Sequence, residues 1–210
     1  LRLIPEHDGS ARGVAPAAYW NMVGPYGGIT VAQMLQAVLQ HPERLGDPLS
    51  ITVNFAGPVE AGDVRIEAVP VRTNRSTQHW TVSMGQRDAQ GAFVVSTTAT
   101  VITAVRRDTF SVDDLPRPAM PDPMRCERFD TRGAMEWLQR YDMRVVQGAI
   151  PKTWDDSGHE SLSQLWVRDD PPRPLDFVAL SALCDVFYPR VWLRRARRVP
   201  AGTVGMTIYF

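Results

Sequence analysis

Hydrophobic side chains recur at short intervals between residues 29 and 40 and cover most of the circumference of a predicted helix. The apolar positions are Ile29, Val31, Ala32, Met34, Leu35, Val38 and Leu39. A helix that is apolar on almost every side must be buried inside the protein. Pro42 and the segment Gly46-Asp47-Pro48 then end it, which predicts a buried helix of about three to four turns.

Four segments rich in β-branched and aromatic residues follow this helix and predict β-strands. They are LSITVNF (49–55), VRIEAVPVRT (64–73), TQHWTVSMGQR (77–87) and AFVVSTTATVITAV (92–105). Short turns with Gly, Pro, Asn and Asp separate them, so consecutive strands should pair antiparallel. The buried helix is the only available partner for the apolar face of such a sheet. We therefore expect an α+β domain in which a curved antiparallel sheet wraps around one long helix.

A proline-rich stretch at residues 108–124 interrupts this pattern and predicts a linker. It would separate an N-terminal domain, residues 1–107, from a C-terminal domain, residues 125–210. Beyond it the order of elements begins again. The predicted elements are a strand in HESLSQLWVR (159–168), a helix in LDFVALSALCDVF (175–187) and a strand in VGMTIYF (204–210).

The segments SITVNF and GMTIYF occupy the same place after their respective helices, which indicates an internal duplication of the fold. In the first copy further strands follow Phe55, whereas the second copy reaches only Phe210. The second copy is therefore expected to be incomplete in this sequence. Either the remaining strands or another chain should cover the open face.

Charge and cysteine content restrict the possible functions. Lysine plus arginine equals aspartate plus glutamate at 23 each, so no affinity for nucleic acid or for a membrane surface is expected. Cys126 and Cys184 lie in different segments without a histidine at metal-ligand spacing, which argues against a disulfide scaffold or a metal site. No apolar run approaches the roughly 18 to 20 residues that cross a bilayer, and the first residues do not resemble a signal peptide. We expect a cytoplasmic protein.

Asp185 is the strongest candidate for chemistry because it lies among apolar residues, in ALCDVFYP, on a helix predicted to be buried. An ionised carboxylate is costly to bury without partners, so such a residue usually has a role or a strong set of hydrogen bonds. The alternative is that Asp185 lies near the helix end and points into solvent. The matching region of the first helix, around Gln36 and Ala37, contains no carboxylate, which suggests one working site per pair of halves.

Two further groups could assist a carboxylate at this position. Thr203 and Thr207 follow the second helix, and a threonine hydroxyl could orient a water, although threonine is also common in strands for its propensity alone. Tyr26-Gly27-Gly28 precedes the first helix, whose unpaired leading amides could bind a carbonyl oxygen, an oxyanion or a phosphate. A tight turn into a buried helix explains the same glycines.

Two other residue patterns bear on function. No Ser-His-Asp order and no GxSxG motif is present among the four histidines, so nucleophilic serine catalysis is not expected. The arginines of residues 194–198 could bind the phosphates of a nucleotide-like cofactor or an anionic partner, or could form a solvated loop.

Taken in order, several segments resemble the acyl-CoA thioesterase II family, the TesB-like double hot-dog thioesterases. They are GPYGGITVAQMLQAV, LSITVNFAGPVEAGDV, VRTNRSTQHWTV, PLDFVALSALCDVFYP and GTVGMTIYF. The resemblance implies a tandem hot-dog fold that hydrolyses fatty acyl-CoA to a free fatty acid and coenzyme A. It also implies an active site with an aspartate, a threonine or serine, and a glutamine. The first two fall on Asp185 and Thr203, and the glutamine would follow Phe210.

The same resemblance implies a mechanism without cofactor or metal, in which the polar residues activate a water and main-chain amides stabilise the oxyanion. The family's usual His-Gly-Gly is here Tyr26-Gly27-Gly28, which we expect to bind substrate. Coenzyme A is expected near the surface, against Arg75 or a partner subunit. The chain is expected to form a homo-oligomer, although the tandem unit could also work alone.

Two alternatives remain. A hot-dog hydratase or dehydratase would abstract a proton from the acyl chain with a histidine and an acidic partner, which neither predicted helix provides. A catalytically silent protein that binds acyl-CoA or supports assembly is the second alternative, because the expected glutamine does not occur in this sequence.

Overall fold

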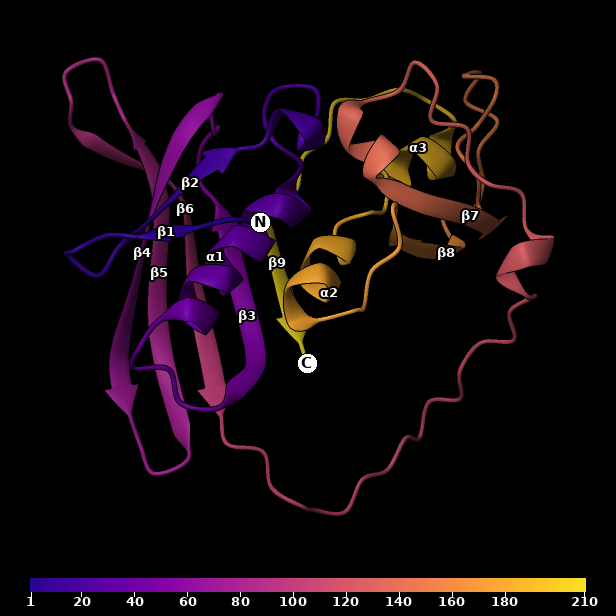
Figure 1. Cartoon of the computed structure of the whole chain (residues 1–210). Helices are drawn as coiled ribbons and strands as arrows, with labels where there is room; N and C mark the ends of the chain where they lie inside the picture. The colour runs from indigo at the N-terminus through magenta and orange to yellow at the C-terminus, as the bar shows by residue number, and fades with distance from the viewer.

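A computed structural model describes residues 1–210 and contains one large antiparallel sheet in the order β1-β2-β4-β5-β6-β3-β9. Its strands are β1 (Ile4–Pro5), β2 (Ala11–Ala15), β3 (Asp47–Phe55), β4 (Gly62–Thr73), β5 (Thr77–Arg87), β6 (Phe93–Ala104) and β9 (Gly205–Tyr209). The sheet curves around one face of the helix α1 (Gly27–Gln40), as Figure 1 shows. This confirms the α+β hot-dog architecture expected from the first half of the sequence.

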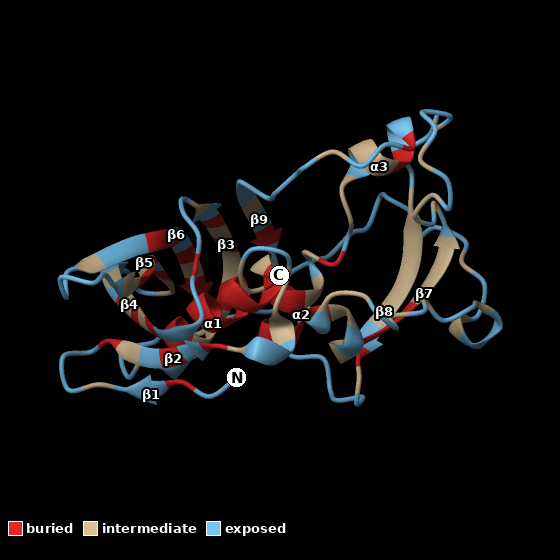
Figure 2. Cartoon of the chain, turned by 90° about the horizontal axis from the view of Figure 1, so that it is seen from above, coloured by how far each residue is buried: buried red, intermediate tan, exposed pale blue.

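The core lies between α1 and the concave face of the sheet. Val31, Met34 and Leu35 of α1 are fully buried, and Ile51 and Trp80 of the sheet pack in the same cluster. Figure 2 shows burial concentrated along α1, α2 and the inner parts of the strands that cover them. The all-round apolar pattern of α1 therefore has two causes, because the sheet covers one side and α2 covers another.

Strand β9 joins the second half of the chain to the sheet of the first half. It pairs antiparallel with β3, and Thr52 lies directly opposite Thr207, with their hydroxyl oxygens 3.1 Å apart. These two threonines occupy the same position in SITVNF and GMTIYF. Antiparallel pairing of equivalent residues relates the two copies by an approximate two-fold rotation, as expected for a duplicated unit that pairs with itself.

The second half contains shorter elements than the first. They are the 3₁₀ turns η2 (Pro123–Arg125) and η3 (Glu136–Arg140), the hairpin β7 (Tyr141–Gln147) and β8 (Gln164–Asp169), and the helices α2 (Phe177–Leu183) and α3 (Arg190–Arg195). One further 3₁₀ turn, η1 (Ala17–Tyr19), precedes α1. Figure 1 shows the hairpin and α3 on the side of α2 away from the large sheet.

Two expectations for this half need correction, and two of its elements were not expected. The strand expected at residues 159–168 begins only at Gln164, and the helix expected at 175–187 ends at Leu183. Asp176 caps that helix by accepting a hydrogen bond from the Ala179 amide at 2.7 Å, which fixes its start. The sequence reading also missed β7 and α3, although β7 alternates apolar and charged side chains and Pro189 precedes α3 as a helix-starting residue.

Residues 105–122 contain no helix or strand and form the long arc below the two halves in Figure 1. None of the helices has the length and hydrophobicity that a bilayer crossing requires.

Candidate functional site

Asp185 lies in the turn just after α2 and is half-buried. Its carboxylate accepts a hydrogen bond from the hydroxyl of Thr203, with Oγ1 and Oδ1 3.2 Å apart, and another from the backbone amide of Gly28. Burial raises the pKa of Asp185, and these two hydrogen bonds act in the opposite direction. The residue is therefore beyond the helix on which we expected it, but it faces the start of α1 instead of open solvent.

The close approach of α1 and α2 explains why glycines occupy the start of α1. A β-carbon on Gly27 would lie 2.6 Å from Oδ2 of Asp185, and one on Gly28 would lie 2.3 Å from the carbonyl oxygen of Ala182. Tyr26 completes this junction by donating a hydrogen bond from its hydroxyl to the same carbonyl at 2.5 Å. The amino end of α1 and the carboxyl end of α2 thus meet at the carboxylate, where the positive end of the α1 dipole favours a negative charge.

Asp185 and Thr203 line a cavity of about 290 Å³ that is mostly apolar. Asn21 is its other polar lining residue close to the start of α1. The apolar lining comes mainly from the second half and includes Phe129, Met135, Trp137, Leu138, Met143, Val145, Ile150, Val186, Phe187 and Trp192. Apolar pockets with a few convergent polar groups are the usual form of a small-molecule site. A larger hollow of about 880 Å³, lined by residues of β2, β4, β5, β6 and the β3–β4 loop, contains neither Asp185 nor Thr203, and its lining is more polar.

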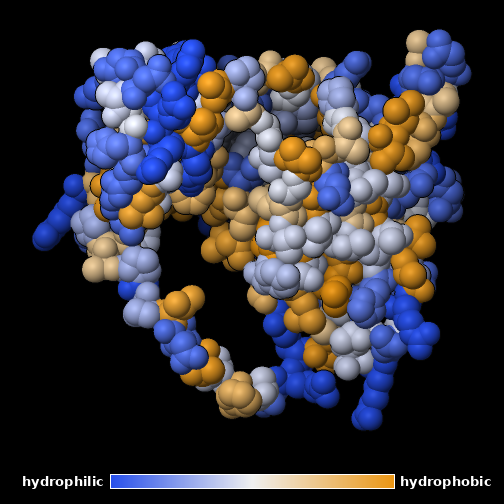
Figure 3. All heavy atoms as spheres, turned by 180° about the vertical axis from the view of Figure 1, so that it is seen from behind, coloured by the Kyte–Doolittle hydropathy of each residue, from blue (hydrophilic) through white to orange (hydrophobic).

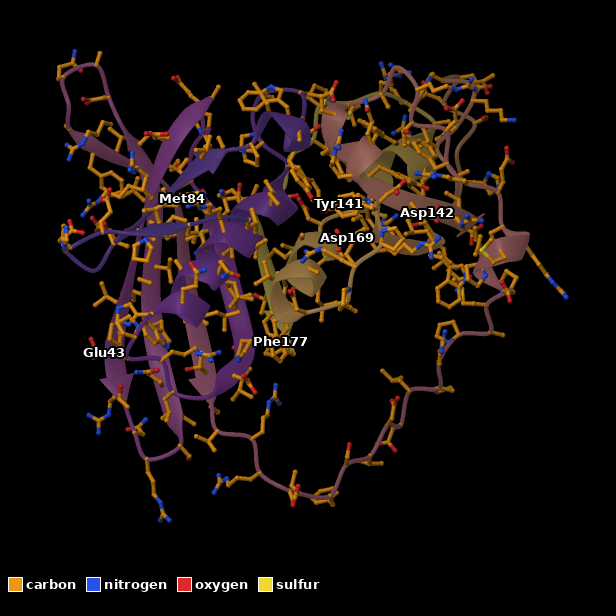
Figure 4. The ribbon with its side chains drawn as sticks, viewed as in Figure 1. Glu43, Met84, Tyr141, Asp142, Asp169 and Phe177 are labelled. Carbon is orange, nitrogen blue, oxygen red and sulfur yellow. The ribbon has the colours of Figure 1, made fainter.

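The aromatic rings of Tyr26 and Trp137 form part of the wall of this cavity, and Tyr141 packs against both. Tyr26 stacks on Trp137 with ring centroids 4.2 Å apart, and Tyr141 meets both rings edge-on at 6.1 Å. Burial is the main cause that raises the pKa of Tyr141 and of Tyr26 well above the usual value for a phenol, so both remain protonated. Figure 4 shows Tyr141 and Asp169 close to α2, and Asp142 farther from it.

Neither Trp137 nor Tyr141 is among the candidates that the sequence indicates. Their positions depend on how η3 and β7 dock against the start of α1, and no local motif encodes that docking. The only sequence signal was the pair of aromatic residues in EWLQRYD, a segment that belongs to no predicted element.

Two residues considered from the sequence lie away from this site. Arg75 is exposed in the β4–β5 turn, and neighbouring Gln78 hydrogen-bonds the chain just after α1, at the Glu43 carbonyl. Asp185 lies at the opposite end of α1, and a helix of 14 residues spans about 21 Å. The Thr207 hydroxyl bonds to Thr52 on the sheet instead of to the carboxylate.

The other residues that could bind a metal ion or an anion are the acidic residues, the histidines, the cysteines and the arginines around α3. No group of three or more His, Cys, Asp or Glu side chains is arranged to hold a metal ion. The arginines of residues 194–198 lie at the end of α3, and Trp192 of the same helix lines the cavity. Cys184 is a free, exposed thiol next to Asp185.

Comparison with known families matches both halves of the chain. A family described as the acyl-CoA thioesterase N-terminal domain matches residues 16–104, and one described as the acyl-CoA thioesterase C-terminal domain matches residues 112–210. No protein with a curated description matches the chain.

Several solved structures share the fold. A conserved protein of unknown function with a hot dog fold from Alicyclobacillus acidocaldarius is 46% identical, with a TM-score of 0.90, over 100% of this chain and 75% of that protein. A putative thioesterase II from Thermobifida fusca is 19% identical, with a TM-score of 0.78, over 98% of this chain and 76% of its own. The acyl-CoA thioesterase II TesB2 from Mycobacterium marinum is 20% identical, with a TM-score of 0.64, over 88% and 66% respectively. The last two likenesses establish the hot-dog fold alone.

Proposed function

Because the chain belongs to the acyl-CoA thioesterase family through both its N-terminal and its C-terminal domain, we propose that it hydrolyses fatty acyl-CoA at the site formed by Asp185 and Thr203. The observation that carries this proposal is the half-buried carboxylate of Asp185, which Thr203 and the Gly28 amide hold at the wall of an apolar cavity. A cavity of this kind can bury an acyl chain and bring its thioester next to a base.

The proposed reaction uses Asp185 as a general base. The hydroxyl of Thr203 engages Oδ1, while Oδ2 lies beside Gly27 and can accept a proton from a bound water. The water oxygen then bonds to the thioester carbonyl carbon, and the carbon–sulfur bond breaks as the tetrahedral intermediate collapses. The thiolate of coenzyme A takes up the proton and leaves, and the fatty acid remains. A raised carboxyl pKa strengthens Asp185 as a base near neutral pH.

The Gly28 amide donates to Asp185, so in this arrangement it orients the base and does not bind the substrate as the sequence predicts. Tyr26 and Gly27 retain proposed substrate contacts, since Tyr26 lines the cavity and Gly27 lies beside Oδ2 of Asp185. The phenol of Tyr26 is held by the Ala182 carbonyl, so its ring face is the part that an acyl chain would meet.

The size of the cavity suggests the length of acyl chain that it accepts. A volume of 290 Å³ corresponds to about ten groups the size of a water molecule at about 30 Å³ each, and a methylene group is of similar size. We therefore propose medium-length fatty acyl groups, packed against the Trp137 and Tyr26 rings.

We retain two proposals on organisation. Residues 108–124 would link an N-terminal hot-dog unit, residues 1–107, to a C-terminal unit, residues 125–210. A homo-oligomer is also proposed, on the family membership that both domains show.

Release of free thiol from a series of acyl-CoA substrates tests the proposed activity. The Asp185→Asn variant should lower kcat by about 10²- to 10⁴-fold, because amide nitrogen and oxygen cannot take up the water proton. Asp114→Asn, a change in the exposed linker, serves as the matched control and should leave kcat unchanged. In the parent protein, kcat/KM should fall as the pH drops through the raised pKa of Asp185, above the usual value of about 3.9.

An Asp185→Asn protein that turns over at the parental rate would show that another group is the base. Binding of acyl-CoA without any turnover by the parent chain would favour the silent acyl-CoA-binding alternative. The hydratase alternative finds no support in this geometry, because no histidine lines the cavity.

A further inference from the structure

We propose that the arginines around α3, namely Arg190, Arg197 and Arg198, bind the phosphates of the nucleotide portion of coenzyme A. This inference rests on the proposed thioesterase function and adds a location for the part of the substrate that does not react. It replaces Arg75, which lies at the opposite end of α1 from Asp185.

Positive charge is concentrated on the segment that follows the catalytic turn. Residues 186–210 contain five arginines and no aspartate or glutamate, whereas the whole chain has a net charge of zero. Figure 3 shows strongly hydrophilic atoms gathered at the end of the molecule that carries α3. A local excess of positive charge next to a cleft attracts an anionic ligand even when the protein as a whole is neutral.

Two of the five arginines already have structural partners. Arg194 donates to the carbonyl of His159, and Arg195 lies 3.4 Å from the carboxylate of Asp156. Both also belong to the last turn of α3, where the helix dipole favours a cation. Asp155, Asp156 and Glu160 are the acidic residues on the loop opposite, and Asp156 is already engaged.

The other three arginines have no carboxylate partner. Two of them lie over aromatic rings, and the third is exposed to solvent. The Arg190 guanidinium lies 4.4 Å from the ring centre of Phe187 and also donates to Ser163. Arg198 lies 4.7 Å from the ring centre of Trp154, and Arg197 is exposed. Guanidinium groups held on aromatic faces keep their donors available, and these donors match phosphate oxygens in geometry.

These arginines lie at the rim of the cavity that contains Asp185. Phe187, which carries Arg190, lines that cavity, and so does Trp192. The Trp192 indole donates to the carbonyl of Val199 at 2.8 Å, which holds the segment of Arg197 and Arg198 against the cavity wall.

The spacing along the chain suits the shape of coenzyme A. Arg190 is five residues from Asp185, and Arg198 is five residues from Thr203. Five residues reach at most about 18 Å when fully extended, which is a distance that the pantetheine arm can cover. The thioester can therefore lie at Asp185 while the phosphates reach the α3 rim.

Two substrates that share one acyl group test this assignment. Hexanoyl-CoA carries the phosphates, and S-hexanoyl-N-acetylcysteamine lacks the entire nucleotide. In the double variant Arg197→Gln/Arg198→Gln, the ratio of kcat/KM for hexanoyl-CoA to that for the short thioester should fall about ten- to a hundredfold. Added salt should lower the same ratio in the parent protein. Arg125→Gln, a charge loss on the surface turn η2, is the matched control and should leave the ratio unchanged.

An unchanged ratio in the double variant would overturn the proposal while leaving the thioesterase function intact. A fall in the ratio for Arg75→Gln instead would restore the β4–β5 turn as the phosphate site. If the parent protein hydrolyses neither substrate, the thioesterase function fails, and calorimetric binding of coenzyme A still tests the arginines. Weaker binding by the double variant than by the parent would support the site, and equal binding or none would reject it.

Discussion

Each half of the molecule contributes one helix to the contact between α1 and α2, but the two helices differ in length and surroundings. In the first half, α1 has 14 residues, begins at a Gly-Gly pair and is wrapped by a curved sheet. In the second half, α2 has only seven residues and is followed at once by the turn that carries Asp185. Strand β7 and helix α3 form the other boundary of the site.

Because of this difference, the residues that stabilise the fold lie mainly in the first half, and the candidate functional residues lie mainly in the second half. Most of the buried hydrophobic cluster lies in the first half, where α1 packs closely against the sheet and the fully buried polar residues are all uncharged. The second half contains the half-buried carboxylate, the cavity and the arginine-rich segment. A duplicated fold can place a costly charge in one copy when the other copy supplies the core, which is a common arrangement at functional sites.

The largest effect on stability is expected from Trp80→Ala in the first half. Trp80 is 1% exposed, lies in the main core and donates its indole N–H to Thr103 at 3.3 Å. Removing the ring should lower the free energy of unfolding by about 3 to 5 kcal/mol, measured by urea denaturation. Trp166→Ala, a half-buried residue of β8, should cost no more than about 2 kcal/mol. Equal losses at the two positions would contradict the proposed division between the halves.

An intermediate effect is expected where the two helices meet, from Gly28→Ala. The added carbon would lie 2.3 Å from the Ala182 carbonyl oxygen, so α1 and α2 must move apart. We expect a loss of about 1 to 3 kcal/mol in the free energy of unfolding, together with a lower kcat, because the Gly28 amide orients Asp185. Gly57→Ala is the matched control, since its added carbon would meet only ordinary contact at 3.9 Å. A fully stable and active Gly28→Ala protein would refute the close approach of the helices.

The first half was predictable from sequence because its signals are local. The apolar period of α1 and the β-branched strands between short turns each specify an element without reference to the rest of the chain. The predicted helix at 29–40 is confirmed within two residues at its start, and all four strands after it occur. The Gly-Gly pair also lies where the sequence placed it, at the amino end of that helix.

The second half was less predictable because its site depends on long-range docking. Asp185 was recognised as an unusual buried acid, but the sequence placed it on a helix, whereas α2 ends two residues earlier. The stacking of Trp137 on Tyr26 joins residues 111 positions apart, and neither residue's neighbours encode it. Thr203 was assigned through its family resemblance, and its contact with Asp185 depends on the turn after α3 that the sequence did not reveal.

The smallest effect is expected on the pH dependence of stability. It concerns two acids of the second half, Asp185 and Asp142, whose pKa values shift in opposite directions. Burial raises the pKa of Asp185 in the folded protein. The contribution of the protonated carboxyl to stability is therefore present below the unfolded pKa and is lost as the pH rises through the raised pKa. For Asp142, burial acts to raise the pKa, but hydrogen bonds from Arg144 and Arg168 outweigh it and lower the pKa. Ionised Asp142 therefore contributes stability above the unfolded pKa of about 3.9, and this contribution is lost as the pH falls through the lowered pKa.

Replacing each acid by asparagine should thus change the melting temperature in opposite directions at pH 7. Asp185→Asn should leave Tm equal or raise it by a few degrees, because a costly buried charge is removed, whereas Asp142→Asn should lower Tm, because Arg144 and Arg168 lose their anionic partner. Both differences should shrink toward pH 3, where Asp185 is protonated in the folded and the unfolded protein alike and Asp142 becomes increasingly protonated. Thermal unfolding followed by circular dichroism from pH 3 to pH 8 measures both curves. A lower Tm for Asp185→Asn at pH 7 would mean that Thr203 and the Gly28 amide more than offset the cost of burial, and that this carboxylate stabilises the fold that it serves.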